Sequence, residues 1–473
     1  MERTRTRFAP SPTGFMHIGN LRTALFEYLV AKHDNGDFIL RIEDTDQTRK
    51  VEGATEFIYD TCKLCGLTFD EGPNNPGNYG PYFQSERLEI YQEYAKKLVE
   101  MGHAYYCFCD EDRLNKLREE ASNNKVPFKY DGHCLKLTKE EIETRIKNNE
   151  PYVIRQKMPK EGTSIYNDIV FGEIKVDHSV LEDQILIKSD GYPTYNFANV
   201  IDDHLMDINY VIRGNEYLMS TPKYNLLYDA FGWKRPNYIH LPMVLGPDGL
   251  KLSKRNGDAS FMDLYHEGYL PEAIVNYLAL LGFKPVTTDE IFSLEELIKI
   301  FDPKRIGKSP AIFDIKKLNW VNSHYMKKLS IDDLLKITVN HLKEAYDLND
   351  KTDEWIRHLV TIYQDHISYG KEIVEVTDLF FKDEIALNDE ATEFMKNDGI
   401  DNTLKIFKEE IENITEWNIE NINKAIMNTK DRALVKGKML YMPIRIKVSG
   451  QMHGPELPDT IYLLGKDLVL KRL

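Results

Sequence analysis

The segment from residue 12 to residue 20 places the tightest constraint on how the N-terminal part of this chain can fold. It reads PTGFMHIGN and lies between a predicted strand at 5–8 and a predicted helix, in which apolar residues recur at helical spacing from Leu21 to Tyr28. A second strand is predicted at 38–42. This order predicts two parallel strands with a right-handed crossover. Sheets of this kind bind ligands at the carboxyl ends of their strands.

A loop that opens a helix is a natural site for an anion. The unpaired N–H groups of the first turn and the positive end of the helix dipole attract phosphate. Gly14 and Gly19 let a ligand approach the backbone closely, and His17 lies at the same edge. From this motif alone, His17 either contacts a phosphate or only caps the helix.

A second short motif strengthens the phosphate interpretation. Residues 246–249 (GPDG) predict a turn, and Lys251, Ser253 and Lys254 follow it in the sequence KLSKR. Lysine is a compact charge that can follow a phosphate group as its charge redistributes. Alone, such a cluster is more typical of a solvated surface. Together with residues 12–20 it predicts a clamp around the phosphates of ATP, and therefore a nucleotidyl-transfer enzyme.

The motifs HIGN and KLSKR resemble the HIGH and KMSKS signatures of the class I aminoacyl-tRNA synthetases. Three longer segments make the chain most similar to the bacterial glutamyl-tRNA synthetases: RFAPSPTG from residue 7, RIEDTD from residue 41 and SDGYPTY from residue 189. The resemblance runs along the whole chain and is strongest up to about Phe283. Asn20 departs from the last histidine of the HIGH signature, at a position that often varies in this subfamily.

The resemblance implies an α/β fold of the class I synthetases. A Rossmann-type parallel sheet is interrupted by an inserted α+β domain that binds the acceptor stem, and an all-α anticodon-binding region follows. We expect the catalytic domain over 1–78 and 183–245, the insertion over 79–182, and a stem-contact domain carrying the KLSKR loop over 246–322. The helical region covers 323–473, as one domain or as two divided near residue 376.

The local patterns agree with this division. Strands are predicted at 183–188, 210–213 and 238–241, and a helix is predicted from Thr221 to Gly232, because Pro222 suits a first turn and glycine suits a helix end. Beyond residue 323, helical periodicity with abundant Lys and Glu dominates.

The charge of the chain limits how it can bind nucleic acid. The 473 residues carry a formal net charge of −15 with a pI of about 5.4, so no general basic field attracts tRNA. A tRNA partner must instead meet local basic patches, for which 304–308 and 436–447 are candidates. We find no signal peptide and no apolar run long enough to cross a bilayer. We therefore expect a cytoplasmic monomer with no membrane partner.

Amino-acid activation joins the substrate α-carboxylate to the α-phosphate of ATP, so the site must stabilise charge on the phosphate oxygens. We predict that four residues take part in catalysis: His17, Gly19, Lys251 and Lys254. The predicted ATP contacts are Pro12, Thr13, Gly14, His17, Gly19, Asn20, Ser253 and Lys254. Mg²⁺ is expected to bind mainly through the phosphates.

Selecting L-glutamate requires cations for two carboxylates and an anion for one ammonium group. Arg7 and Arg213 are the candidate carboxylate ligands, and Glu43 can accept the α-amino group. The resemblance adds four pocket residues: Ala9, Ser11, Tyr195 and Asn199. The alternatives are that the arginines form structural ion pairs, or that the acidic residues of 43–46 are general acids or metal ligands.

Five cysteines in so long a chain argue against a disulfide framework. Cys62 and Cys65 fit the apolar face of a helix. The resemblance suggests a zinc site formed by Cys107, Cys109 and Cys134, but Lys136 occupies the usual place of the fourth ligand. Since structural zinc takes four ligands, either His133 substitutes or three reduced cysteines remain without a metal.

Three other functions are alternatives to a glutamyl-tRNA synthetase. Glutaminyl-tRNA synthetases share the catalytic core but have a β-rich distal part, whereas this one has a helical pattern. A shorter glutamyl transferase that modifies a tRNA base lacks the anticodon-binding region. A non-catalytic tRNA- or nucleotide-binding module would not need the lysine loop.

The partner tRNA is tRNA(Glu), and tRNA(Gln) is a second candidate. Family members restricted to tRNA(Glu) are expected to read the third anticodon base with an arginine. The matching segment here is Gln364-Asp365-His366. We therefore expect Gln364 and His366 near the anticodon, and an enzyme that also charges tRNA(Gln) with glutamate.

Overall fold

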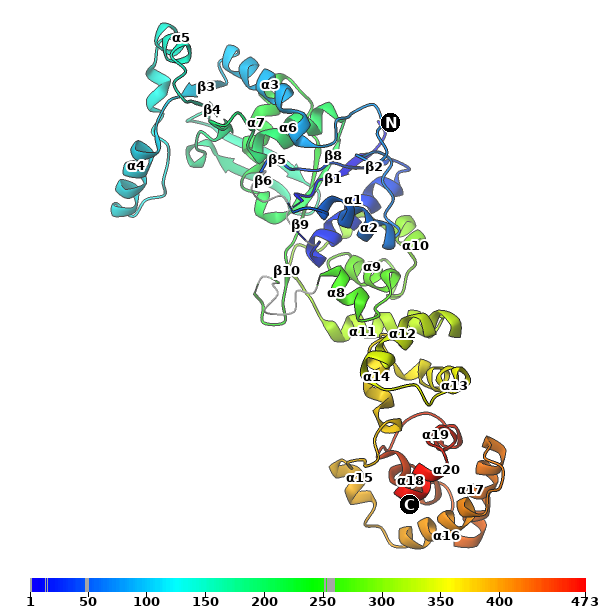
Figure 1. The fold of residues 1–473 in the computed structure, drawn as a ribbon. Helices are drawn as coiled ribbons and strands as arrows, with labels where there is room; N and C mark the ends of the chain where they lie inside the picture. Colours follow the sequence, from blue (N-terminus) through cyan, green and yellow to red (C-terminus); the bar gives the residue numbers. More distant parts are fainter. Residues whose placement is uncertain (1, 13, 15, 47–50, 251, 253–259) are drawn as a thin grey trace. The chain divides into compact units, whose positions relative to one another are not determined.

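The computed structural model describes residues 2–473 except 13, 15, 47–50, 251 and 253–259 (Figure 1). The chain forms two compact units. The first contains Met1–Met262 and Val275–Asp314, and the second contains Asp263–Ile274 and Ile315–Leu473. The five segment boundaries expected from the sequence stay predictions.

The predicted β-α-β unit forms at the N-terminus of the first unit. Strand β1 (Arg5–Phe8) pairs in parallel with β2 (Asp37–Leu40), and helix α1 (Ile18–His33) connects them. The helix lies against the sheet because most of its side chains are apolar and buried. The loop before α1 therefore opens at the carboxyl end of β1, as predicted.

A second β-α-β unit adds two more parallel strands. Strand β8 (Tyr210–Gly214) pairs with β9 (Asn237–Leu241), and α7 (Thr221–Phe231) connects them. Pro222 lies in the first turn of α7, and Gly232 ends the helix in the left-handed region at φ 67°, which confirms both predicted ends. The backbone N–H of Asn209, just before β8, donates to the carbonyl of Arg5 in β1 at 3.2 Å. The carboxyl ends of both strand pairs thus face one side.

The inserted segment mixes helices and strands, as predicted. Its helices are α3 (Leu88–Glu100), α4 (Glu111–Asn123) and α5 (Lys139–Lys147), and helix α2 (Ala54–Leu64) precedes it in the chain. Strands β3 (Ala104–Cys107), β4 (Val153–Gln156) and β7 (Ile185–Ile187) form an antiparallel sheet in the order β3-β4-β7. Strand β7 is shorter than the predicted 183–188, because the Asp183 carboxylate accepts the Tyr105 hydroxyl and the Met158 N–H instead of facing solvent from a strand.

Strands β5 (Thr163–Asp168) and β6 (Gly172–Asp177) leave the insertion and join the catalytic sheet. The sheet order is β6-β5-β9-β8, and Asp168 at the end of β5 pairs with Tyr238 of β9. Helix α6 (Tyr195–Leu205) lies between β7 and β8 in the sequence. The first unit also contains β10 (Val244–Leu245), α10 (Leu294–Ile300) and β11 (Ala311–Ile312). Helices α8 (Phe261–His266) and α9 (Pro271–Leu280) each have residues in both units.

The second unit is helical throughout its described elements after residue 315, in agreement with the sequence. The helices are α11 (Ile315–Met326), α12 (Ile331–Ala345), α13 (Asp353–Tyr363), α14 (Glu372–Thr377), α15 (Asp389–Phe394), α16 (Ile400–Glu412), α17 (Ile419–Ala433), α18 (Lys438–Ser449), α19 (Leu457–Leu464) and α20 (Lys466–Arg472). Their apolar faces share one core around fully buried Leu359, Phe407 and Ile426. Among the described residues, no helix is long and apolar enough to span a membrane.

Two glycines bring distant segments of the second unit together. The N–H of Gly370 donates to the carbonyl of Gly268 at 3.0 Å, and the rings of Tyr269 and Tyr369 stack with centroids 4.7 Å apart. Gly268 has φ +87°, and a Cβ on it would lie 2.6 Å from the Gly370 Cα. The contact therefore requires glycine both for its backbone angle and for the close approach.

We predict that Gly268→Ala destabilises the second unit more than Gly399→Ala. Gly399 has a matching φ of +88°, but a Cβ there would meet nothing within 4 Å. Both changes cost about 1–2 kcal/mol for the left-handed backbone, and Gly268→Ala adds about 1–3 kcal/mol of steric overlap. Urea unfolding followed by far-UV circular dichroism measures the difference, and equal losses of stability would contradict the close-approach argument.

Candidate active site

A cavity of about 980 Å³ opens in the first unit where the parallel strands end. Residues that follow β1, β2, β8 and β9 line it, together with the first turn of α1. Nine of the residues predicted from the sequence are among them: Arg7, Ala9, Ser11, His17, Gly19, Asn20, Glu43, Tyr195 and Arg213. The fold thus brings together side chains that are up to about 200 positions apart in the sequence.

Other predicted residues lie elsewhere or are not described. Pro12, Gly14 and Asn199 are not among the described residues that line the cavity, and the Asn199 side chain donates to the carbonyl of Tyr195 at 2.8 Å. Thr13, Lys251, Ser253 and Lys254 lie outside the described residues. Residues 246–250 do form the predicted turn, since the Gly249 N–H donates to the Gly246 carbonyl at 2.9 Å.

The first turn of α1 presents backbone groups to the cavity. His17 occupies the N-cap position, but its side chain makes no capping hydrogen bond, so capping does not account for this histidine. A Cβ at Gly19 would meet nothing within 4 Å. The helix terminus is therefore open to a ligand, and its dipole favours an anion.

A buried ion-pair network forms the floor beneath Glu43. Asp203 of α6 accepts from Arg7 Nε at 2.9 Å and from Arg41 Nη1 at 2.8 Å. Arg41 also pairs with Glu43 at 3.0 Å, and Arg7 Nη1 lies 3.4 Å from Glu27. Arg7 is therefore an ion-pair partner that also lines the cavity, and its role as a carboxylate ligand stays a prediction.

The network carries more acidic than basic groups. Three guanidinium groups face four carboxyl groups in the described set of Arg7, Arg41, Arg87, Glu27, Glu43, Asp202 and Asp203. Burial raises the pKa of Glu27 and of Glu43, although nearby arginines oppose the shift. A carboxyl group of this set thus holds a proton more readily than an exposed glutamate. An incoming ammonium group can take the place of that proton at Glu43, which lines the cavity.

Arg213 is a different kind of cation. It is 6% exposed and has no ion pair with a carboxylate among the described residues. Its guanidinium lies 4.6 Å from the Tyr224 ring centroid and 5.2 Å from that of Tyr217. Aromatic faces stabilise a cation without neutralising it, so Arg213 keeps its charge for an anionic ligand in the cavity.

Sequence patterns missed Arg22, a second buried cation on the cavity wall. It is 3% exposed, and burial lowers its pKa to about 10. Its Nη1 donates to the carbonyl of Pro242 at 2.8 Å, while Nε and Nη2 are buried and make no hydrogen bond with a described residue. Its position one turn after the HIGN loop was the available signal, but only the fold shows that it faces the cavity.

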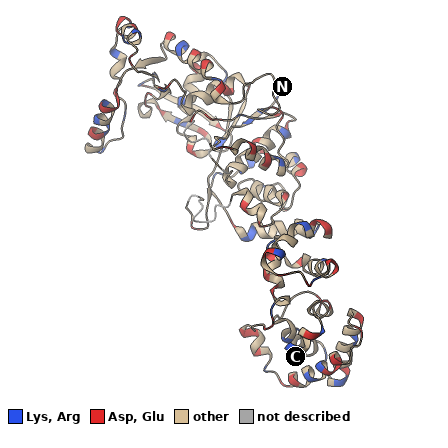
Figure 2. Cartoon of the chain, in the orientation of Figure 1, with Lys and Arg blue, Asp and Glu red and all other residues tan. Residues whose placement is uncertain are grey.

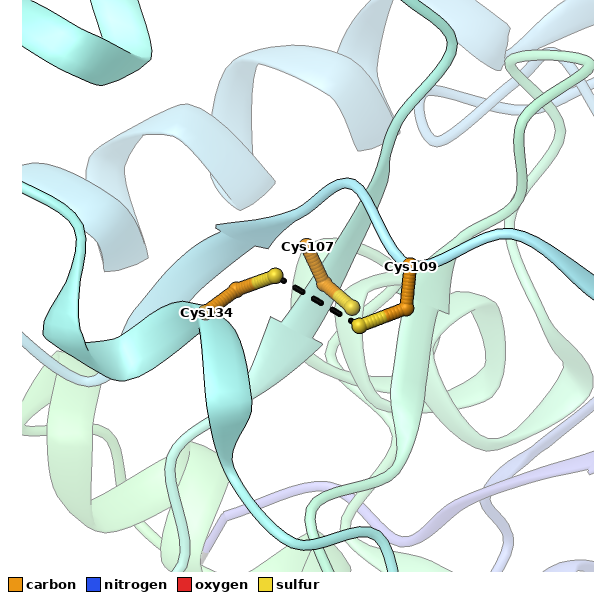
Figure 3. Close-up of side chains that lie close together, drawn as sticks. All are labelled: Cys107, Cys109 and Cys134. Atoms are coloured by element: carbon orange, nitrogen blue, oxygen red, sulfur yellow. Dashed lines mark hydrogen bonds between the residues drawn. The ribbon is translucent and has the colours of Figure 1, made fainter. Parts of the chain in front are cut away.

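The three cysteines predicted as metal ligands converge in the insertion (Figure 3). Their sulfur atoms lie within 4.8 Å of one another, and Cys109 Sγ is 3.6 Å from Cys134 Sγ. The Tyr130 hydroxyl lies 3.3 Å from both Cys107 Sγ and Cys109 Sγ. His133 is exposed and is not part of this group. Tyr130 therefore occupies the place that sequence reasoning offered to His133.

Two further predictions concern buried and distal positions. Cys62 and Cys65 are both buried at α2, as predicted. In the second unit, Gln364 Nε2 donates to the carbonyls of Met326 and Leu329 at 3.1 and 3.0 Å, whereas the His366 side chain is exposed. The Gln364 amide is thus engaged within the chain.

Two family models cover most of the sequence. Residues 3–320 match the catalytic domain of the class I tRNA synthetases (E and Q), and residues 333–473 match an anticodon-binding domain. The second match coincides with the helical unit, and the first contains the cavity.

Relatives match the chain over its full length. It is 50% identical to a glutamate–tRNA ligase of Clostridium kluyveri, with 100% of this chain and 97% of the relative covered, and 52% identical to one of Clostridium botulinum (strain Eklund 17B), with 100% and 98% covered. A crystal structure of a glutamate tRNA ligase from Elizabethkingia meningosepticum in complex with its amino acid has a TM-score of 0.87, 35% identity and coverage of 100% and 98%. The glutamate-tRNA synthetase of Elizabethkingia anophelis has a TM-score of 0.89, 35% identity and coverage of 100% and 99%. The chain belongs to the class I tRNA synthetases of the E and Q family.

Proposed function

We propose that this protein is a glutamate–tRNA ligase, which activates L-glutamate with ATP to glutamyl-adenylate and transfers the glutamyl group to the 3′ end of tRNA(Glu). One observation carries the proposal. A single cavity combines a buried guanidinium that pairs with no carboxylate among the described residues, an ion-pair network with one more carboxyl group than guanidinium groups, and an open helix N-terminus. These features complement the side-chain carboxylate, the ammonium group and the phosphates of the two substrates.

The roles of the individual residues follow from this complementarity. Arg213 binds the side-chain carboxylate of glutamate, because no acid among the described residues neutralises it. Glu43 accepts the α-ammonium group. Arg7 can still donate to a carboxylate, since its Nη2 makes no hydrogen bond with a described residue. Ala9, Ser11 and Tyr195 line the remaining wall.

Activation then proceeds by attack of the glutamate α-carboxylate oxygen on the α-phosphate and departure of pyrophosphate. His17 and the backbone at Gly19 hold the ATP phosphates, with Asn20 beside them. Lys254 and Lys251 stabilise the charge that grows on the phosphate oxygens. Mg²⁺, bound mainly through the phosphates, supplies further positive charge.

The proposed setting of the enzyme follows from its substrates. Its partner is tRNA, so we place it in the cytoplasm, where aminoacyl-tRNA is used, and we propose that it acts as a monomer. Lys and Arg are interspersed with Asp and Glu over much of the chain (Figure 2). Binding of tRNA by local basic patches should therefore weaken steeply as salt rises.

Zinc is proposed in the insertion. Three thiols and a phenol within hydrogen-bonding distance form a four-donor set of the size that zinc requires. We assign Cys107, Cys109, Cys134 and Tyr130 as the ligands. Bound zinc would stabilise the turn between α4 and α5, far along the chain from the predicted phosphate clamp.

Charging of tRNA(Gln) is the second part of the proposal. In enzymes restricted to tRNA(Glu) an arginine is expected within the segment that here reads Gln364-Asp365-His366, and the Gln364 amide donates to two carbonyl groups. A guanidinium is therefore missing there as a reader of the third anticodon base, and His366 is the exposed neighbour. We therefore propose that the enzyme discriminates little at the third anticodon base.

We predict that Lys254→Ala lowers the rate of glutamyl-adenylate formation about 10²- to 10³-fold, because a cation that stabilises transition-state charge is lost. The KM for glutamate should change less than about twofold, since binding of the ground state does not depend on this lysine. ATP–pyrophosphate exchange in the presence of tRNA measures both. Lys175→Ala, an exposed lysine of β6, is the control. An unchanged exchange rate in Lys254→Ala would remove Lys254 from the mechanism.

We predict that the purified enzyme attaches glutamate to both tRNA(Glu) and tRNA(Gln), and that it attaches glutamine to neither. Radiolabelled amino acid on each purified tRNA measures this, with the two tRNAs assayed side by side. Charging of tRNA(Glu) alone would contradict relaxed anticodon reading. Charging of neither tRNA would contradict the proposed function itself.

We predict about one zinc ion per chain in protein purified without chelator, and a ratio near zero for Cys109→Ser. Tyr130→Phe should lower the ratio as well, because it removes the proposed fourth donor. Cys65→Ser, a buried cysteine outside the cluster, is the matched control and should keep its zinc. Elemental analysis by mass spectrometry measures the ratio. No zinc in the unmodified protein would mean three reduced cysteines without a metal.

A further inference from the structure

Three buried side chains, those of Asp168, His240 and Arg213, are joined by hydrogen bonds behind the cavity. Asp168 Oδ2 lies 2.7 Å from His240 Nδ1, and His240 Nε2 lies 3.2 Å from Arg213 Nε. Asp168 ends β5, His240 belongs to β9 and Arg213 belongs to β8, which are neighbours in the sheet. Because Arg213 pairs in register with His240, the strand pairing itself sets this alignment.

The hydrogen bonds around Asp168 and His240 determine which of their atoms carry protons. Asp168 Oδ1 accepts from the N–H groups of Val170 and Phe171, and Oδ2 accepts from the N–H of His240 and from its ring. The three backbone partners can only donate, so both carboxylate oxygens act as acceptors and the ring proton of His240 lies on Nδ1. Burial lowers the pKa of His240, which keeps the ring neutral. Nε2 therefore offers a lone pair to the N–H of Arg213.

A second acceptor holds the same edge of the guanidinium. Thr221 Oγ1 accepts from Arg213 Nη2 at 2.8 Å, and it lies 3.3 Å from His240 Nε2. Both acceptors thus face the edge that carries Nε and Nη2. Nη1 makes no hydrogen bond with a described residue, and Arg213 lines the cavity. The end of the guanidinium that carries Nη1 and Nη2 remains available for a bidentate carboxylate.

The histidine also separates two opposite charges. If Asp168 contacted Arg213 directly, its carboxylate would compete with a substrate carboxylate for the same N–H groups. A neutral imidazole between them transmits the orientation of Asp168 without placing an anion on the guanidinium. Thr221 is likewise uncharged, so both acceptors orient Arg213 and leave its charge intact.

We propose that Asp168 and His240 are positioning residues that hold Arg213 in the orientation that binds the side-chain carboxylate of the amino-acid substrate. The inference rests on the proposed function and deepens it, because it extends the glutamate subsite by two residues that do not line the cavity. Asp168 lies within the segment 79–182 that the sequence assigns to the insertion. Its strand β5 nevertheless belongs to the sheet of β8 and β9, so the proposed subsite stays within that sheet.

Two amide substitutions of His240 distinguish an effect on the orientation of Arg213 from an effect on folding. In His240→Asn the shorter amide can still donate to Asp168 but cannot reach Arg213, whereas the longer amide of His240→Gln can accept from Arg213 Nε. We expect His240→Asn to raise the KM for glutamate about 10- to 100-fold, the effect of one lost hydrogen bond to a charged group. His240→Gln should stay within about threefold of the unmodified enzyme. The KM for ATP should change less than about twofold in both variants.

Aminoacylation kinetics with each substrate varied in turn measure these constants. His204→Gln is the matched control, since His204 stacks on Trp233 and forms no hydrogen bond with Arg213 in the described part of the chain. An unchanged glutamate KM in folded His240→Asn, or equal rises in both KM values in both variants, would overturn the positioning role. If His240→Asn does not fold, Asp168→Asn decides, because its N–H₂ group opposes the donors around it, and an unchanged glutamate KM there overturns the proposal. Failure of the unmodified enzyme to charge any tRNA would count against the proposed function instead.

Discussion

The ion pairs around Asp203 are the constraint on which the candidate site depends. One carboxylate oxygen accepts from Arg7 of β1 and from Arg41 just beyond β2, and Asp203 itself belongs to α6. Removing one partner from such a buried set leaves an uncompensated charge, which costs about 3–5 kcal/mol. The strands and the helix are thus held at the spacing that lets Arg7 and Glu43 reach the cavity. The same residues thus support the fold and take part in the proposed substrate recognition.

Two arginines that line the cavity differ in whether a carboxylate compensates their charge. The sequence alone did not separate them. Arg7 is compensated by Asp203 and Glu27, whereas Arg213 is surrounded by tyrosine rings, a neutral histidine and a threonine. A compensated arginine contributes mainly to folding, and an uncompensated one attracts a ligand anion. Burial alone does not separate the classes, because both side chains are almost fully buried.

Much of the fold could be predicted because its signals are local. Apolar spacing in α1, Pro222 and Gly232 at the ends of α7, and helical periodicity after residue 315 each depend on neighbours in the chain. The predictions were wrong or incomplete where contacts between residues far apart in the sequence determine the structure. Strand β7 is shortened by side-chain hydrogen bonds to Asp183, and the donor beside the cysteines is Tyr130 and not His133. Neither the length of β7 nor the Tyr130 donor can be predicted from a residue pattern of fixed spacing.

The sequence by itself determined the two nucleotide motifs, the β-α-β order, the helical distal region and nine of the residues that line the cavity. These follow from local backbone preference and from motif spacing, which a linear chain displays directly. Only the tertiary structure decided which charges are paired, which face of each side chain is open, and that Asp168, His240 and Arg213 stand in one line. The pairing of β5, β9 and β8 brings these three together, and charge compensation depends on distances in space that residue order does not encode.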